Sequence, residues 1–144
     1  MFYRFKFFED KNLLKVMVYG KADPQSMRSR LALLANDHRW KSEYKLLIDY
    51  SNVTTIDAPR EFGKTLRDLL KELPEARLPV GIAYVFPERL FCQCFDAEQN
   101  TFRLGAKCDV QFFRQEVPAV EWLEQLAAEG SATTRFVDLA PGEQ

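Results

Sequence analysis

The chain has 144 residues, 47% of them hydrophobic and 28% charged, so it carries ample apolar material for the core of one domain. Lys and Arg total 20 against 21 Asp and Glu, and this balance excludes bulk electrostatic attraction to nucleic acid. No apolar run reaches the roughly 18 residues that span a bilayer. Charges also interrupt the aromatic start, where a signal peptide would be continuously apolar, so we expect a cytoplasmic protein.

The N-terminal third predicts a hairpin followed by a helix. Residues 2–8 and 13–19 read as two strands, and the four residues between them are too few for a crossover, so the strands are antiparallel. Asp23 followed by Pro24 is typical of a helix start. Apolar residues at helical spacing extend that helix to about Asn36.

The middle of the chain predicts two buried strands with one helix between them. Residues 44–50 and 80–86 are continuous apolar runs, which are typical of strands buried on both faces. Residues 51–57 are polar and read as a loop, and Pro59 suits a helix start. An apolar stripe at helical spacing then closes at Pro74; it consists of Phe62, Leu66, Leu69 and Leu73.

The C-terminal part predicts one strand between two helices. Pro87 opens a helix that we expect to end at Gly105. Its apolar face would be formed by Phe91, Cys94, Phe95 and Phe102. Residues 109–114 read as a strand, and residues 117–128 read as the last helix.

The order β-β-α-β-α-β-α-β-α predicts an α/β fold. Strands joined through single helices are parallel and have right-handed crossovers. We therefore expect a mostly parallel central sheet with an antiparallel N-terminal strand and about four helices, in a single domain over residues 1–129. The C-terminal tail, residues 130–144, has no periodic pattern, and it either adds an edge strand at 134–139 or lies loose.

No catalytic, nucleotide-binding or metal motif can be read from the sequence. The six glycines form no phosphate-binding turn. His38 is the single histidine, lies in a charged stretch and reads as a surface residue. Cys92, Cys94 and Cys108 lack the paired spacing of structural zinc and read as reduced thiols, with small apolar side chains that suit a core. We predict a non-enzymatic protein without catalytic residues, cofactor or metal.

Asp49 ends a predicted central strand and invites comparison with a phospho-accepting receiver domain. The acidic pair that such a domain places after its first strand would here be Glu9 and Asp10, which lie in a hairpin turn instead. Arg114 and Gln115 stand where the receiver Lys would follow the last strand. The pattern therefore favours an Asp that ties the following loop.

The predicted helix 59–73 also carries a basic stripe, which we call the basic ridge. It repeats at the spacing of the apolar stripe but on another face, and comprises Arg60, Lys64, Arg67 and Lys71. Acidic residues lie between these positions, so a solvated helix face is one interpretation. A docking surface for an acidic partner or an anionic head group is the other.

Residues 46–66, LLIDYSNVTTIDAPREFGKTL, resemble the segment of STAS domains (sulfate transporter and anti-sigma-factor antagonist) that runs strand, loop and then an Asp-Ser pair opening a helix. Asp57 matches the Asp of that pair. The ending VQFFRQEVPAVEWLEQL is similar to the finish of the SpoIIAA-like branch, in which an Ala is followed three residues later by Trp-Leu, here Ala119, Trp122 and Leu123. The order of elements agrees over roughly residues 1–128.

The resemblance implies a regulatory module that binds a protein partner through the loop 51–58 and the helix 59–73. The open end of a parallel sheet is also where partners dock in such folds. The expected partner-binding residues are Ser51, Asn52, Thr54, Thr55, Asp57, Arg60, Lys64 and Arg67. Ala58 stands where the anti-sigma antagonists have their phosphorylated Ser, so the usual phosphoswitch lacks its hydroxyl; Thr54 and Thr55 lie nearby as substitutes or as ordinary loop residues.

A second interpretation, also implied by the lipid-binding relatives of this branch, is a small apolar ligand held against the sheet. The surplus of Phe supports it, and the predicted pocket residues are Phe86, Phe91 and Phe95. The aromatic residues in 2–8 also need a cover. A homodimer is the favoured cover, with a helix or the C-terminal tail as alternatives.

Overall fold

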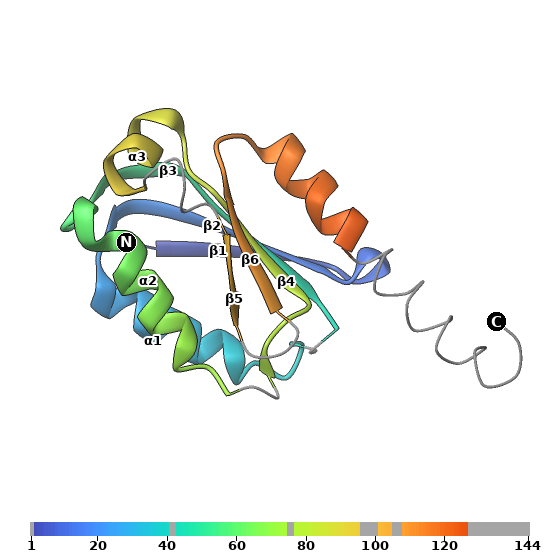
Figure 1. Ribbon diagram of the computed structural model, residues 1–144. Helices are drawn as coiled ribbons and strands as arrows, with labels where there is room; N and C mark the ends of the chain where they lie inside the picture. The colour runs from blue at the N-terminus through green and yellow to red at the C-terminus, as the bar shows by residue number, and fades with distance from the viewer. Residues whose placement is uncertain (1, 41–42, 75–76, 96–100, 105–107, 127–144) are drawn as a thin grey trace, which may run out of the picture.

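The computed structural model describes residues 2–40, 43–74, 77–95, 101–104 and 108–126, which form one sheet with helices on both faces (Figure 1). The strands are β1 (Phe2–Phe8), β2 (Leu13–Ala22), β3 (Lys45–Ile56), β4 (Gly81–Val85), β5 (Thr101–Leu104) and β6 (Cys108–Phe113). The helices are α1 (Pro24–Ala35), α2 (Phe62–Lys71), α3 (Glu88–Cys94) and a last helix over residues 116–126. Two short 3-10 turns are η1 (Glu9–Lys11) and η2 (Pro59–Glu61).

The strand order is β1-β2-β3-β4-β6-β5. The four inner strands are parallel, and β1 and β5 are antiparallel to their neighbours at the two edges. The predicted α/β fold, with a mostly parallel sheet and an antiparallel N-terminal strand, is confirmed. The β1–β2 hairpin turns through η1 and Asn12, whose left-handed backbone (φ 50°) Asn tolerates better than most residues.

Strand alternation divides the core into two layers. On the front face, α1, α2 and α3 cover side chains such as Ile48, Tyr84 and Phe112. On the back face, the last helix covers a smaller set, Leu47, Ala83 and Val85, with its own Ala119 and Leu123. The two layers lie on opposite sides of the sheet in Figure 1.

Local sequence signals account for two of the front helices. The Asp23 side chain accepts a hydrogen bond from the Ser26 N–H at 2.9 Å and caps α1, with Pro24 in the first helical position. The capping hydrogen bond lowers the pKa of Asp23. In α2 three residues of the predicted apolar stripe, Phe62, Leu66 and Leu69, are buried together with Leu70, whereas Leu73, the fourth, follows the end of the helix and is half-buried.

The strand β3 is longer than predicted. It continues through the mostly polar residues 51–55 to Ile56, because β2 also continues to Ala22 and pairs with this stretch. Register shifts between β2 and β3 interrupt the alternation there. Most of the predicted loop 51–58 is therefore strand, and the predicted helix 59–73 begins as η2 and becomes α-helical only from Phe62.

The prediction of one helix from Pro87 to Gly105 is wrong. α3 ends at Cys94, and Thr101–Leu104 is a strand that pairs antiparallel with β6. The apolar spacing that suggested a longer helix fits a short strand equally well. The predicted tail 130–144, including the edge strand at 134–139, lies outside the described residues.

Candidate functional site

The predicted partner-binding residues gather at the end of the sheet where the parallel strands finish. β3 pairs with β4 only as far as Asp49, so residues 50–56 pair with β2 alone and form with it a ribbon that extends beyond β4 and, from Val53 onward, beyond β1 as well. Its buried side chains include Val53 and Ile56. Its exposed side chains, together with Asp57, form what we call the ribbon surface: Ser51, Asn52, Thr54, Thr55 and Asp57.

Backbone contacts fix the ribbon in place. The Arg89 guanidinium, from α3, donates to the carbonyl of Val53 (2.6 Å) and to that of Thr54 (3.2 Å). The Asp57 N–H donates to the Ala22 carbonyl at 2.9 Å. These bonds satisfy backbone groups on strands without a full set of neighbours, so the ribbon surface is preorganised.

Asp49 lies where the ribbon leaves the sheet and is buried. Its carboxylate accepts a hydrogen bond from the Ser51 N–H at 2.9 Å. The prediction that Asp49 ties the chain that follows it is confirmed, although that chain is strand and not loop.

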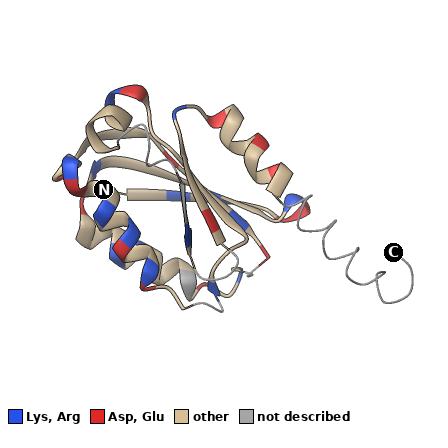
Figure 2. Cartoon of the chain, in the orientation of Figure 1, with Lys and Arg blue, Asp and Glu red and all other residues tan. Residues whose placement is uncertain are grey.

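The basic ridge lies on the outer side of η2 and α2, next to the ribbon. Arg60, Lys64 and Lys71 are exposed, whereas Arg67 is half-buried. Lys64 forms an i, i+4 ion pair with Asp68 at 3.1 Å. Figure 2 shows basic residues along α2 with acidic ones between them, so the ridge is a mixed surface in which the bases predominate.

The predicted ligand residues form part of the packed front core. Phe86 is fully buried and stacks on Tyr50 with ring centroids 4.4 Å apart. Phe95 packs edge-on against Phe86 (5.0 Å) and Phe91 lies 5.3 Å from Phe95. Rings this close fill the space between them, so these aromatic residues pack as core.

A cavity of about 490 Å³ lies elsewhere, between the C-terminal halves of α1 and α2. Its apolar lining comes from Leu31 on α1, Leu69 on α2, Leu73 just after α2, and the Trp40 ring, whose Nε1–H donates to the Arg77 carbonyl at 3.0 Å. An ion pair between Arg28 and Glu72 (3.2 Å) joins the two helices at its rim. Sequence reasoning missed this cavity because it forms only when two helices distant in the chain pack together.

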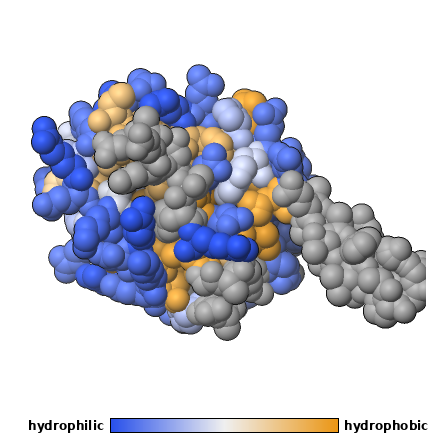
Figure 3. Space-filling view, viewed as in Figure 1, coloured by the Kyte–Doolittle hydropathy of each residue, from blue (hydrophilic) through white to orange (hydrophobic). Residues whose placement is uncertain are grey.

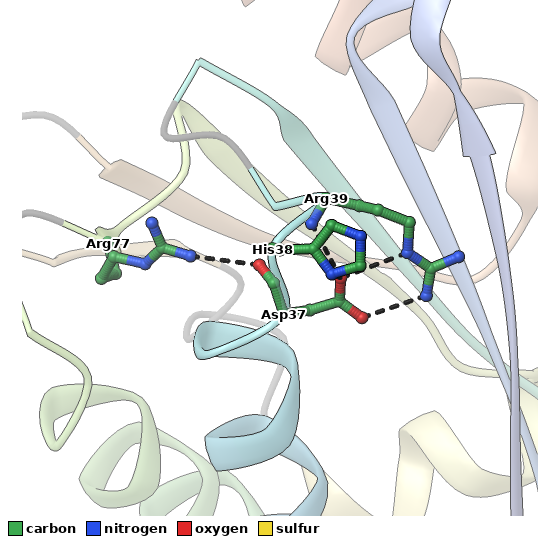
Figure 4. Close-up of polar contacts among 4 residues, drawn as sticks. All are labelled: Asp37, His38, Arg39 and Arg77. Atoms are coloured by element: carbon green, nitrogen blue, oxygen red, sulfur yellow. Dashed lines mark hydrogen bonds and ion pairs between the residues drawn. The ribbon is translucent and has the colours of Figure 1, made fainter.

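The polar rim of this cavity includes Asp37, His38 and Arg77 (Figure 4). Asp37 forms an ion pair with Arg39 at 3.0 Å, and hydrogen bonds from Arg39 lower the pKa of Asp37 to about 2. The Arg77 guanidinium donates to the Asp37 carbonyl at 3.4 Å. His38 is 93% exposed, which confirms the surface position predicted for it.

Other titratable groups with shifted pKa values include thiols and buried phenols. Cys92 is exposed, and Cys94 and Cys108 are buried. Burial raises the pKa of the Cys94 thiol to about 12 and raises the pKa of Tyr50 and Tyr84 above the usual range. Among the described residues no three His, Cys, Asp or Glu side chains gather as a metal site would require.

Comparison of the chain with models of known protein families gives no match, and comparison with curated proteins gives no match. The likeness to STAS domains therefore depends on the sequence pattern described above. Within the described residues, no helix has the length and apolarity needed to cross a membrane.

Proposed function

We propose that the protein is a non-enzymatic regulatory module, similar to STAS domains, that binds a protein partner through the ribbon surface and the basic ridge. The observation that carries this proposal is the ribbon itself, a polar strand pair that extends past β4 and is fixed by Arg89. A surface that is already ordered loses little conformational entropy on binding. Exposed polar residues on a rigid support are typical of recognition surfaces.

The ridge supplies the electrostatic part of the proposal. Arg60 and Lys64 lie directly after the ribbon, and both are exposed. Cations at the rim of an interface raise the association rate of acidic partners. Ala58, the residue between the ribbon and η2, has no hydroxyl, so partner binding is not controlled by phosphorylation at that residue.

Charge reversal tests the proposal. The double variant Arg60→Glu and Lys64→Glu removes two exposed cations and one ion pair, and it leaves half-buried Arg67 unchanged. The matched control is Lys11→Glu with Arg103→Glu, which also reverses two exposed charges and breaks one exposed ion pair, between Arg103 and Asp109. Tagged proteins are used to recover partners from cell extract, and the partners are quantified by mass spectrometry.

We expect the ridge variant to lose a set of partners that the wild type and the control retain. The proposal is wrong if the ridge variant recovers the same partners in the same amounts as the control. Urea unfolding of both variants separates loss of binding from loss of folding.

A second candidate function is supported by the cavity between α1 and α2. Its volume of about 490 Å³ is within the range of small-molecule sites. Leucine side chains and charged groups line it together, so the ligand would be amphipathic. Native mass spectrometry of the purified protein tests this: a bound small molecule should be lost in Ala32→Trp, which fills the cavity, and kept in Ser29→Trp, an exposed α1 position outside it.

A further inference from the structure

The outer side of β1 lies at the edge of the sheet. β1 pairs with β2, and within the part of the chain that the structure describes no strand lies on its other side. At every second residue of β1 the backbone N–H and C=O groups therefore point outward. Such a row of groups is a template for an added strand. The strand is seven residues long, which is enough to pair with an extended peptide.

A groove of about 80 Å³ runs between this edge and α1 on the front face. Phe5 and Phe7 line it from β1, and Leu33 and Leu34 line it from α1. Phe5 is 40% exposed and Leu33 is 62% exposed, so two of the most exposed large apolar side chains in the described part of the chain lie side by side along one groove. Exposed apolar side chains that gather in this way mark interaction sites.

The edge is also basic. Arg30 lies over the Tyr3 ring at 5.5 Å, and Arg39 lies over the Phe7 ring at 4.5 Å. On the back of the same strand, Arg4 and Lys6 are exposed. Asp37 is the one acidic side chain among the described residues that line the groove, and it is paired with Arg39.

We propose that the β1 edge binds an extended acidic segment of a partner protein as an additional strand. Backbone hydrogen bonds to β1 would hold the segment. Its apolar side chains would lie on the front, in the groove with Phe5 and Leu33, and its acidic side chains would lie on the back, beside Arg4 and Lys6. This surface is separate from the ribbon surface and the basic ridge, so the inference does not depend on the proposed function.

A second copy of the chain fits this edge poorly. Antiparallel pairing of two β1 strands centred on Phe5 places Arg4 of one copy opposite Lys6 of the other. Like charges directly opposite each other destabilise a strand pair. The basic residues thus disfavour self-association through this edge and favour an acidic strand.

The test uses the full chain and a fluorescein-labelled peptide of ten residues in which Glu and Val alternate. Fluorescence anisotropy at low salt should show saturable binding. The variant Arg4→Glu with Lys6→Glu should bind about ten-fold more weakly or worse. The matched control Lys21→Glu with Arg103→Glu, which reverses two exposed charges away from the β1 edge and outside the basic ridge, should bind as the wild type does.

Two further peptides distinguish strand addition from simple charge attraction. A Lys-Val peptide should not bind, and the Glu-Val peptide with every amide N-methylated should bind at least about ten-fold more weakly, because it cannot donate to β1. Absence of binding, or equal binding by the methylated peptide, would overturn the inference. So would a dimer in sedimentation velocity that the Arg4 and Lys6 reversal abolishes, since a second copy would then be the occupant.

Discussion

The front and back faces of the sheet are covered unequally. On the front, three helices bury a continuous cluster that reaches from Leu14 on β2 to Phe112 on β6. On the back, the last helix buries a small cluster around Leu47, and Phe2 remains 56% exposed where it stacks on Tyr19. In the view of Figure 3 the outer surface of the α1 and α2 layer is mostly hydrophilic, as expected of helices whose apolar faces are buried. The front layer thus provides most of the hydrophobic stabilisation.

Small residues explain how one helix suffices on the back. Gly81 has no side chain and Ala83 has a small one, so the last helix can pack close to the sheet there. Its Leu126 approaches Gly81 closely. A Cβ atom at Gly81 would lie 3.3 Å from a Leu126 methyl group, which is a tight contact. The back layer is therefore thin and closely packed, with less apolar area to lose than the front.

Truncation of Phe86 should produce the largest effect, because this ring is fully buried at the centre of the front aromatic cluster. We expect Phe86→Ala to lower the free energy of unfolding by about 3–5 kcal/mol. Urea denaturation followed by circular dichroism measures it. Should that variant not fold, Phe86→Leu keeps most of the volume and should cost ~1–2 kcal/mol. If each variant lost less free energy of unfolding than its expected range, the front layer would not dominate stability.

Truncation of Leu123 is the corresponding change on the back. The side chain is buried against Leu47, Ala83 and Val85. We expect Leu123→Ala to cost about 2 kcal/mol, the lower end of the range for buried Leu, because fewer large neighbours surround it. Measured in the same urea series, a cost that equals or exceeds that of Phe86→Ala would remove the distinction between the two layers.

The elements that sequence could predict are those with local signals. The Asp23 cap and most of the α2 stripe each lie within one helix, and both are confirmed. The hairpin of β1 and β2 follows from a short connection between two apolar runs. Burial on both faces of β3 and β4 follows from their continuous apolar runs.

The elements that sequence missed depend on pairing between distant segments. Residues 51–55 are mostly polar and resemble a loop, yet β2 supplies a partner that keeps them extended. Thr101–Leu104 has only four residues, too few to show a period of two, and becomes a strand because β6 lies beside it. The candidate partner residues could thus be named from sequence, but their conformation and the cavity between α1 and α2 could not.

Ala58 offers a smaller test, at the point where the ribbon meets the front layer. Its backbone is left-handed (φ 49°), a conformation that costs a residue with a Cβ atom and that glycine adopts freely. The strain energy that glycine relieves in the folded state exceeds the entropic cost of a more flexible unfolded chain. We therefore expect Ala58→Gly to raise the free energy of unfolding by up to about 1 kcal/mol. The matched control is Ala32→Gly in α1, which should destabilise by ~0.5–1 kcal/mol. A destabilised Ala58→Gly variant would show that the position is not strained.

The three cysteines allow the burial of the front layer to be tested in the wild-type protein, without a substitution that changes its stability. Cys92 is exposed on α3, whereas Cys94 and Cys108 are buried, so a thiol reagent should modify one cysteine in the folded protein and all three after unfolding. The Cys92 thiol donates a hydrogen bond to the Glu88 carboxylate (2.9 Å), and this bond raises its pKa. Because the thiolate is the reactive form, the rate should rise with pH, and Glu88→Ala should move that rise to lower pH. Rapid modification of two or three thiols in the folded protein would mean that α3 opens readily, and that the front layer is less firmly closed than its packing indicates.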